Sequence, residues 1–228
     1  MVADDVGGKN QPSTMWDIVE DEEDFILSKP FSHTIRQDCL WAFIRLARYK
    51  FAARYVNKGD VVLDAGCGDG LGSLFLSQFA KEVYGVDTCS KALAYCLRTY
   101  KRENLNFEER ALQDLDYHQR AYDVVVCMDV IEHFSQRDAG KVIHDFAQVL
   151  RPSKGMLILG TPNVESQRFA SEHRKRLHLH EYSADELREM VEQDFHRVII
   201  LSMNDELVHT GFHKLAWYLI AIGFGPKK

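Results

Sequence analysis

Four glycines at alternate positions constrain this chain more than any other feature. They are Gly66, Gly68, Gly70 and Gly72, and they follow a short apolar run that leads into Asp64. An apolar run that breaks into glycine and then into a helix-like segment predicts a strand, a tight turn and a helix. Glycine lets the backbone turn sharply and approach a ligand without interference from a Cβ atom. We therefore predict a ligand-binding turn after the first strand of an α/β sheet, with free N–H groups of the helix start near the ligand.

Two common nucleotide-binding patterns do not fit this turn. The dinucleotide fingerprint G-x-G-x-x-G requires a third glycine where the chain has Leu71 or Ser73, depending on the starting glycine. The phosphate-binding pattern G-x-x-x-x-G-K-[ST] also fails, because Leu71 takes the place of its second glycine. An NAD-dependent dehydrogenase is therefore the weaker alternative, and a different cofactor has to be considered.

The segment D-A-G-C-G-D-G at 64–70 resembles motif I of the class I S-adenosylmethionine-dependent methyltransferases. The resemblance runs from about Arg48 to Gly225 and is most specific in the cofactor half. It implies an α/β fold, namely a Rossmann-like, seven-stranded, mostly parallel sheet whose last strand is antiparallel, sandwiched by helices. It also implies S-adenosyl-L-methionine as the cofactor and S-adenosyl-L-homocysteine as the product.

Length and composition fit one domain of this kind. The chain has 228 residues, 46% of them hydrophobic, and a net charge of −6, which argues against a broad nucleic-acid interface. Five cysteines, an odd number without a C-x-x-C pair, are typical of a reduced, cytoplasmic setting. We see no signal peptide and no apolar run as long as a membrane span. We expect residues 1–24 to form an acidic, partly mobile segment and residues 25–228 to form the domain.

The hydrophobic pattern places the remaining elements. Apolar residues at helical spacing, including Leu40 and Phe43, predict one helix over 34–55. This helix resembles the one that precedes motif I in small methyltransferases, and Tyr49 is a candidate contact for the methionine end of the cofactor. The run 124–127 is typical of a parallel strand that is buried on both faces. The predicted strands after the first are 83–87, 106–111, 122–128, 156–160, 197–203 and 215–224.

Acidic residues after the predicted strands complete the expected cofactor site. Asp87 lies about twenty residues past the glycine turn, the spacing at which a carboxylate reaches ribose hydroxyls. After the third strand, the resemblance places Asp114 near the adenine amino group and Leu112 on the ring face, with Asp116 as the competing acid. In full, the predicted cofactor-binding residues are Tyr49, Asp64, Gly66, Cys67, Gly68, Asp87, Thr88, Leu112, Gln113, Asp114, Cys127, Met128 and His133.

The segment C-M-D-V-I-E-H-F at 127–134 closely resembles the part that follows strand four in ubiquinone-biosynthesis-type methyltransferases. The resemblance implies that its backbone meets the methionine moiety and that Glu132 and His133 lie at the pocket mouth. A histidine titrates near neutral pH and can take a proton from an acceptor. The candidate catalytic bases are His180, His133 and His209.

Loops that follow strands line the site in sheets of this type. We therefore interpret 161–182 as the substrate loop and 203–214 as a connection that closes over the pocket. The substrate loop is rich in Arg, Lys and His, which suits an anionic small molecule. We expect a methyl acceptor with an O or N nucleophile, such as a sugar, a sugar nucleotide or a secondary metabolite. We expect neither a nucleic-acid nor a membrane partner, and the oligomeric state stays open.

Two alternatives remain beside this interpretation. Asp129, Glu132 and His133, with His178 or His180, resemble the Glu-Glu-His-His metal set of some RNA 3′-end methyltransferases. The acidic net charge and the missing closely spaced second histidine argue against that class, so we predict no metal. The other alternative is a cofactor-binding fold that has lost its chemistry and serves as a partner subunit.

Overall fold

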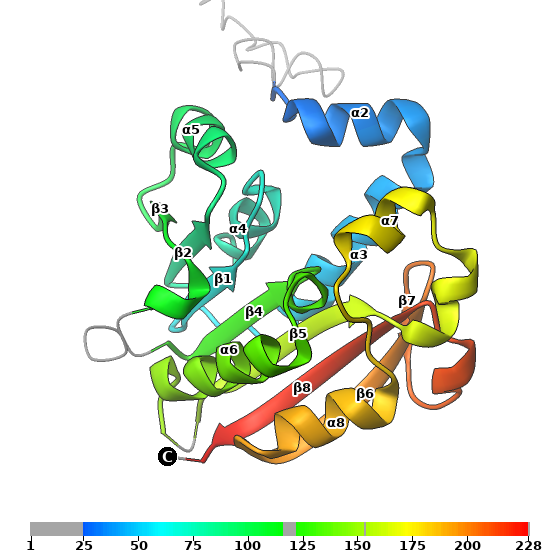
Figure 1. Ribbon diagram of the computed structural model, residues 1–228. Helices are drawn as coiled ribbons and strands as arrows, with labels where there is room; N and C mark the ends of the chain where they lie inside the picture. Colours follow the sequence, from blue (N-terminus) through cyan, green and yellow to red (C-terminus); the bar gives the residue numbers. More distant parts are fainter. Residues whose placement is uncertain (1–24, 116–121, 153, 228) are drawn as a thin grey trace, which may run out of the picture.

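The computed structural model describes residues 25–115, 122–152 and 154–227, and within these residues eight strands form one sheet (Figure 1). The strand order across the sheet is β3-β2-β1-β4-β5-β8-β6-β7. The acidic segment expected at 1–24 lies outside the described residues. The strands are β1 (Val61–Ala65), β2 (Glu82–Asp87), β3 (Leu105–Glu109), β4 (Val124–Met128), β5 (Met156–Pro162), β6 (Phe195–Asn204), β7 (Leu207–His209) and β8 (Tyr218–Pro226).

The strands from β1 to β5 are parallel, and β8 runs antiparallel between β5 and β6. This arrangement confirms the predicted Rossmann-like, mostly parallel sheet with an antiparallel last strand. The predicted count of seven strands was one short, because the chain reverses at Asp205, where φ is 49°, and β7 pairs back onto the end of β6. The last strand begins later than predicted, at Tyr218, since His213–Leu215 forms a 3₁₀ helix.

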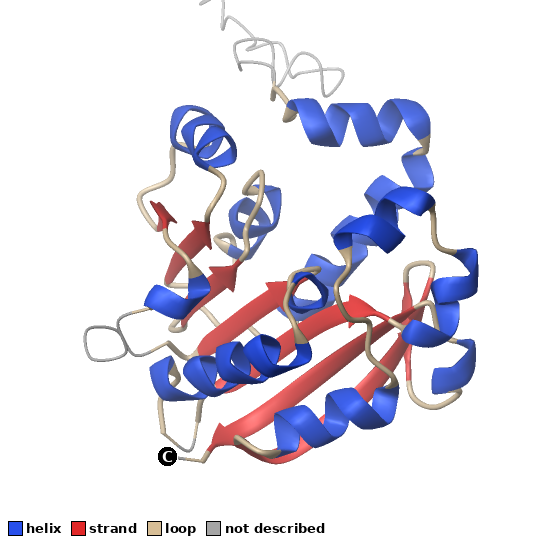
Figure 2. Ribbon diagram, in the orientation of Figure 1, coloured by secondary structure: helices blue, strands red, loops and turns tan. Residues whose placement is uncertain are grey.

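Helices cover both faces of the sheet (Figure 2). They are α2 (Lys29–Gln37), α3 (Cys39–Ala53), α4 (Leu71–Leu76), α5 (Ser90–Thr99), α6 (Gln136–Val149), α7 (Glu172–Leu177) and α8 (Ala184–Glu192). Side chains alternate along β4, so Val125 and Cys127 join the core with α6 and α8. Val124 and Val126 join the core with α3, α4 and α5 on the other face. None of the helices in the described ranges has the length and apolar character needed to cross a membrane.

The prediction of one helix over 34–55 is wrong, because two helices share this stretch. Asp38 separates them with an extended backbone, and its side chain accepts a hydrogen bond from the Leu40 N–H at the start of α3. Leu40 and Phe43, which we assigned to the buried face, are 62% and 58% exposed. The buried face of α3 begins at Ala42 instead and continues through Ile44 and alanines further along the helix.

The sheet brings the expected site residues to one edge. β1 lies between β2 and β4, and all three strands run in the same direction. The glycine turn after β1, Asp87 at the end of β2 and Met128 at the end of β4 therefore lie close together. The carboxyl edge of a parallel sheet is the usual place for a ligand in folds of this type.

Candidate active site

Two cavities open at this edge of the sheet, and both are lined by described residues. The first, the glycine cavity, has a volume of about 660 Å³ and is bounded by the glycine turn, the end of β2 and the segment after β4. The second, the loop cavity, has a volume of about 690 Å³ and is bounded by α3, the segment after β4 and the predicted substrate loop. Asp129 and His133 line both cavities, so the two meet at the segment that follows β4.

The glycine turn presents its backbone to the glycine cavity. Gly66 and Gly68 have φ values of 76° and 55°, a region that residues with a Cβ rarely adopt. A Cβ at Gly66 would lie 2.4 Å from Val130 Cγ2, so the segment after β4 excludes a larger residue there. The Gly68 N–H donates a 2.8 Å hydrogen bond to Asp87 Oδ2, and the Cys89 N–H donates one of 2.8 Å to Asp87 Oδ1. These bonds hold the Asp87 carboxylate beside the turn.

Asp64 lies beneath the turn rather than in the cavity lining. Its carboxylate is fully buried and accepts hydrogen bonds from Ser73 Oγ at 2.6 Å and from Tyr49 Oη at 3.3 Å. Burial raises the pKa of Asp64 from its ordinary 3.8 to about 6, although these two hydrogen bonds act in the opposite direction. Asp64 therefore ties β1 to α3 and α4 and positions the turn.

Most residues predicted to bind the cofactor line the glycine cavity, and three do not. Asp114 is exposed in the 3₁₀ turn Leu112–Asp114, Cys127 is fully buried within β4, and Asp64 lies beneath the turn. Asp116, the competing acid, lies outside the described residues. Those that line the cavity are Tyr49, Gly66, Cys67, Gly68, Asp87, Thr88, Leu112, Gln113, Met128 and His133.

Sequence reasoning missed other residues of this lining, among them Arg45 and Arg110. Arg45 Nη2 donates a 2.7 Å hydrogen bond to Asp69 Oδ1, and Ser28 Oγ donates one of 2.6 Å to Asp69 Oδ2. The start of α2 and the middle of α3 are thus fastened to the glycine turn. In the sequence, Arg45 was one of several arginines on a helix, and nothing there indicated its reach to Asp69.

Asp129 forms the junction of the two cavities. It follows β4 with a φ of 58°, a strained value for a residue with a side chain. Its carboxylate is ion-paired with Arg48 of α3, whose guanidinium lies 3.7 Å from the centre of the Tyr218 ring on β8. Arg48 is buried and Asp129 is half-buried, so the ion pair runs from the core to the cavity wall.

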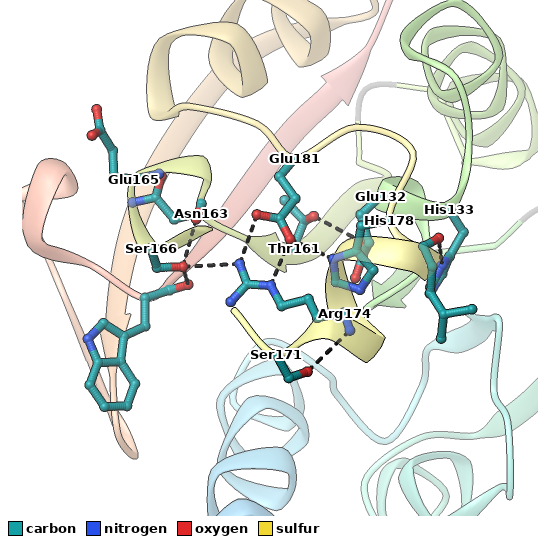
Figure 3. A network of polar contacts seen from close by, with 12 residues as sticks. Glu132, His133, Thr161, Asn163, Glu165, Ser166, Ser171, Arg174, His178 and Glu181 are labelled. Atoms are coloured by element: carbon teal, nitrogen blue, oxygen red, sulfur yellow. Dashed lines mark hydrogen bonds and ion pairs between the residues drawn. The ribbon is translucent and has the colours of Figure 1, made fainter. Parts of the chain in front are cut away.

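A polar network borders the loop cavity (Figure 3). Glu132 is fully buried and accepts a 3.1 Å hydrogen bond from Thr161 Oγ1. Burial, and secondarily the charge of Asp129, raises the pKa of Glu132 well above its usual range. His133 Nδ1 lies 3.1 Å from the Leu177 carbonyl oxygen, which joins the segment after β4 to the substrate loop.

A buried ion pair organises the substrate loop. Arg174 of α7 donates from Nε and Nη2 to the two carboxylate oxygens of Glu181 at 2.7 and 2.9 Å, which is the fork geometry of a strong pair. His178 Nδ1 lies 2.6 Å from Glu181 Oε1, and Arg174 also donates to Ser166 Oγ at 3.1 Å. The loop, which the sequence suggested to be irregular, contains α7 and the 3₁₀ helix Val164–Phe169.

The three candidate bases lie in different places. His133 lines both cavities, whereas His180 and His209 line neither. The His180 ring packs against Tyr182 with 4.7 Å between ring centres, and His209 lies in β7 opposite Ser202. The predicted substrate loop contributes much of the loop cavity, while the 203–214 connection contributes Met203 and Asp205.

Residues 62–153 match a protein family described as "Methyltransferase domain". A Mycobacterium tuberculosis protein named "Probable S-adenosylmethionine-dependent methyltransferase Rv3030" is 36% identical over 102 residues, which is 45% of this chain and 35% of that protein. The ubiquinone biosynthesis O-methyltransferase of Coxiella burnetii is 30% identical over 124 residues, 53% of this chain and 51% of that enzyme. The matched part thus spans between a third and a half of these relatives' length.

Solved structures share the fold across most of the chain. A chain from the complex between the Haloferax volcanii Trm112 methyltransferase activator and its methyltransferase has a TM-score of 0.68 at 17% identity, covering 89% of this chain and 100% of that one. The N-methyltransferase NodS of Bradyrhizobium japonicum, in complex with S-adenosyl-L-homocysteine, has a TM-score of 0.57 at 15% identity, covering 93% and 98%. At these low sequence identities, the similarity shows a shared fold and not a shared activity.

Proposed function

We propose, from the match of residues 62–153 to a methyltransferase domain, that this chain binds S-adenosylmethionine in the glycine cavity and methylates an acceptor in the loop cavity. The observation that carries the proposal is the meeting of the two cavities at Asp129 and His133. Methyl transfer from a sulfonium is an in-line displacement, so donor and acceptor approach the methyl carbon from opposite sides. Two cavities that share one wall permit this approach.

The reaction requires alignment and the removal of one proton. A lone pair of the acceptor forms the bond to the methyl carbon, and the electrons of the broken C–S bond stay on sulfur, which becomes a neutral thioether. The proton leaves an acceptor hydroxyl, or the ammonium that an amine acceptor becomes on methylation, and passes to a base or to water. Of the three candidate histidines we propose His133, because it lies where the cavities meet and the other two line neither.

The lining of the glycine cavity suits the parts of S-adenosylmethionine. Asp87 offers two carboxylate oxygens for the two ribose hydroxyls. Leu112 and Gln113 also line this cavity. Leu112 can pack on the face of an adenine ring, and Gln113 can hydrogen-bond to its edge. We assign Met128 and the glycine turn to the binding of the methionine end of the cofactor. The Asp114 contact that the resemblance implied has no support from its exposed position.

The loop cavity suits a small acceptor with an apolar or aromatic part. Trp41, Phe169 and Trp217 line it, so flat apolar groups find stacking partners there. Its two arginines, Arg48 and Arg174, are each paired with a carboxylate. Their charges are therefore already compensated, which argues against a strongly anionic acceptor. The comparisons favour neither the RNA 3′-end alternative nor the non-catalytic subunit.

Calorimetric titration with S-adenosylhomocysteine tests this function. The native chain should bind it, and Asp87→Ala should raise Kd at least about tenfold, or 1.4 kcal/mol. The control is Glu109→Ala, which removes the carboxylate paired next to Asp87 in the sheet but outside the cavity lining. No binding by the native chain, or equal binding by Asp87→Ala, would remove the glycine cavity as the cofactor site.

A further inference from the structure

We propose that Glu132, His133 and His178 form a binding site for one divalent ion of a first-row transition metal. One potential ligand atom from each of these side chains lies within 4.8 Å of the other two. All three residues line the loop cavity. The binding of the ion does not depend on the proposed function, whereas its role towards the acceptor rests on that function. With the ion bound, His133 is a ligand instead of the base, and the proton of the acceptor passes to water.

The hydrogen bonds of the two histidines fix which ring nitrogen is free. His133 Nδ1 faces the Leu177 carbonyl oxygen at 3.1 Å, and a carbonyl oxygen can only accept, so Nδ1 carries the hydrogen. His178 Nδ1 faces Glu181 Oε1 at 2.6 Å, and the Glu181 carboxylate accepts from Arg174 as well, so it acts as the acceptor towards His178 too. In the neutral form of each ring, Nε2 is therefore the atom with a free lone pair. Metal-bound histidines almost always have their second nitrogen bonded to a carboxylate or a backbone carbonyl in this way.

Glu132 provides the second, independent observation. Its side chain is fully buried, and its Oε2 accepts a hydrogen bond from Thr161 Oγ1. In the part of the chain that the structure describes, Glu132 Oε1 has no hydrogen-bond partner. A buried carboxylate oxygen without a partner is costly, and a cation beside it removes that cost.

The substrate loop is anchored to the backbone of Glu132. The Leu179 N–H donates a 2.8 Å hydrogen bond to the Glu132 carbonyl oxygen, and the His180 N–H donates to the same oxygen at 3.2 Å. This places His178 beside Glu132 although the two are far apart in sequence. The rings of His133 and His178 lie edge to face with 5.1 Å between their centres. The ligand set is thus assembled by backbone contacts that do not depend on the ion.

The donor types select the class of metal. Two imidazoles and one carboxylate suit Zn²⁺, Mn²⁺, Co²⁺ or Fe²⁺ better than Ca²⁺ or Mg²⁺, which prefer oxygen ligands. Three protein ligands leave positions open towards the loop cavity, where an acceptor oxygen can bind and lose its proton more readily. An ion bound there would therefore favour an oxygen acceptor. Neither His180, which packs on Tyr182, nor Asp129, which pairs with Arg48, belongs to the set.

Titration of tag-free, chelator-treated protein with Co²⁺ tests the site without any methyl acceptor. The native chain should bind one equivalent, with the visible absorption bands of Co²⁺ held by nitrogen and oxygen ligands. Glu132→Gln and His178→Gln should abolish these bands. Glu181→Gln changes the partner of His178 Nδ1 and weakens the pair with Arg174, so it should weaken binding about 10–100-fold. His180→Gln is the matched control from the same loop and should bind Co²⁺ like the native chain.

The proposal is overturned if the folded native chain binds none of Co²⁺, Zn²⁺ and Mn²⁺, or if His178→Gln binds Co²⁺ unchanged. It is also overturned if His180→Gln loses the bands to the same extent. Thermal unfolding of each variant identifies any loss of fold. If the ligand variants do not fold, the weaker Co²⁺ affinity of Glu181→Gln tests the site instead. Titration of the same samples with S-adenosylhomocysteine separates the two proposals, because loss of cofactor binding with intact Co²⁺ binding contradicts the function and not the metal site.

Discussion

The ring of Tyr49 on α3 lies directly against the backbone of Gly72 at the start of α4, and a Cβ at Gly72 would be 2.1 Å from the ring. The hydroxyl of the same tyrosine reaches Asp64 Oδ1 at 3.3 Å. Tyr49 therefore fills the space above a glycine of the turn and hydrogen-bonds the acid beneath it. The last of the four glycines is required by packing, since its φ does not lie in the left-handed region.

Gly72→Ala should destabilise the fold because the added methyl group collides with the Tyr49 ring. We expect a loss of about 1–3 kcal/mol in the free energy of unfolding, the usual cost of overpacking a core. Gly140→Ala is the matched control, because Gly140 lies in α6 and a Cβ there meets nothing within 4 Å. That change should stabilise the chain by about 0.5–1 kcal/mol through helix propensity. Urea unfolding of both variants measures the difference, and equal effects would contradict this packing.

Arg48→Met tests the ion pair at the junction of the cavities. Methionine keeps an apolar side chain in this place but removes the guanidinium, which lies over the Tyr218 ring and pairs with Asp129. Asp129 is half-buried and water reaches it, so we expect a loss of about 1–2 kcal/mol in unfolding free energy, below the value for a fully buried pair. Arg98→Met removes an exposed arginine near Tyr95 and should stay within about 0.5 kcal/mol of the native chain. Similar stability of both variants would show that the Arg48 charge contributes little.

Asp64 should make the stability of the native chain fall as the pH rises. Its pKa in the folded chain is about 6, above the ordinary 3.8, so the folded state holds the proton more tightly than the unfolded state. The stabilisation is fully present below pH 3.8 and is lost as the pH passes 6. A rise of about two pKa units corresponds to about 3 kcal/mol at most.

Asp64→Asn keeps the size of the side chain and cannot ionise. Between pH 4 and pH 7, the unfolding free energy of the native chain should therefore decrease by more than that of Asp64→Asn. The groups that titrate elsewhere are common to both proteins and cancel in the comparison. Urea unfolding across this range measures both curves, and parallel curves would contradict the raised pKa.

The lining of the glycine cavity was largely predictable from sequence because it depends on short-range features. The glycine turn and Asp87 follow directly after strands, and parallel strands bring their ends to one edge whatever the rest of the chain does. Spacing alone does not reveal the 3₁₀ turn that leaves Asp114 exposed, and its contact with the adenine stays a prediction. The break at Asp38 was missed because the apolar pattern continues across it.

The acceptor side was much less predictable because it depends on long-range pairing. Arg174 was one of several basic residues in the substrate loop, and only the fold shows that it forms a fork with buried Glu181. His178 and His180 are equivalent in sequence spacing, yet the hydrogen bonds from the loop to the Glu132 carbonyl bring only His178 into the cavity lining. Sequence spacing shows on which side of a segment a residue lies. Tertiary contacts decide which residues from the rest of the chain it contacts.

A crystal structure of the chain with S-adenosylhomocysteine tests the central claim most directly, because the claim is geometric. We predict the ribose at Asp87, the adenine near Leu112 and Gln113, and the sulfur directed at the wall shared by Asp129 and His133, facing the loop cavity. Electron density for the ligand in this orientation would place the transferable methyl group between the two cavities. Ligand bound elsewhere, or with its sulfur directed away from the loop cavity, would contradict the account of how donor and acceptor meet.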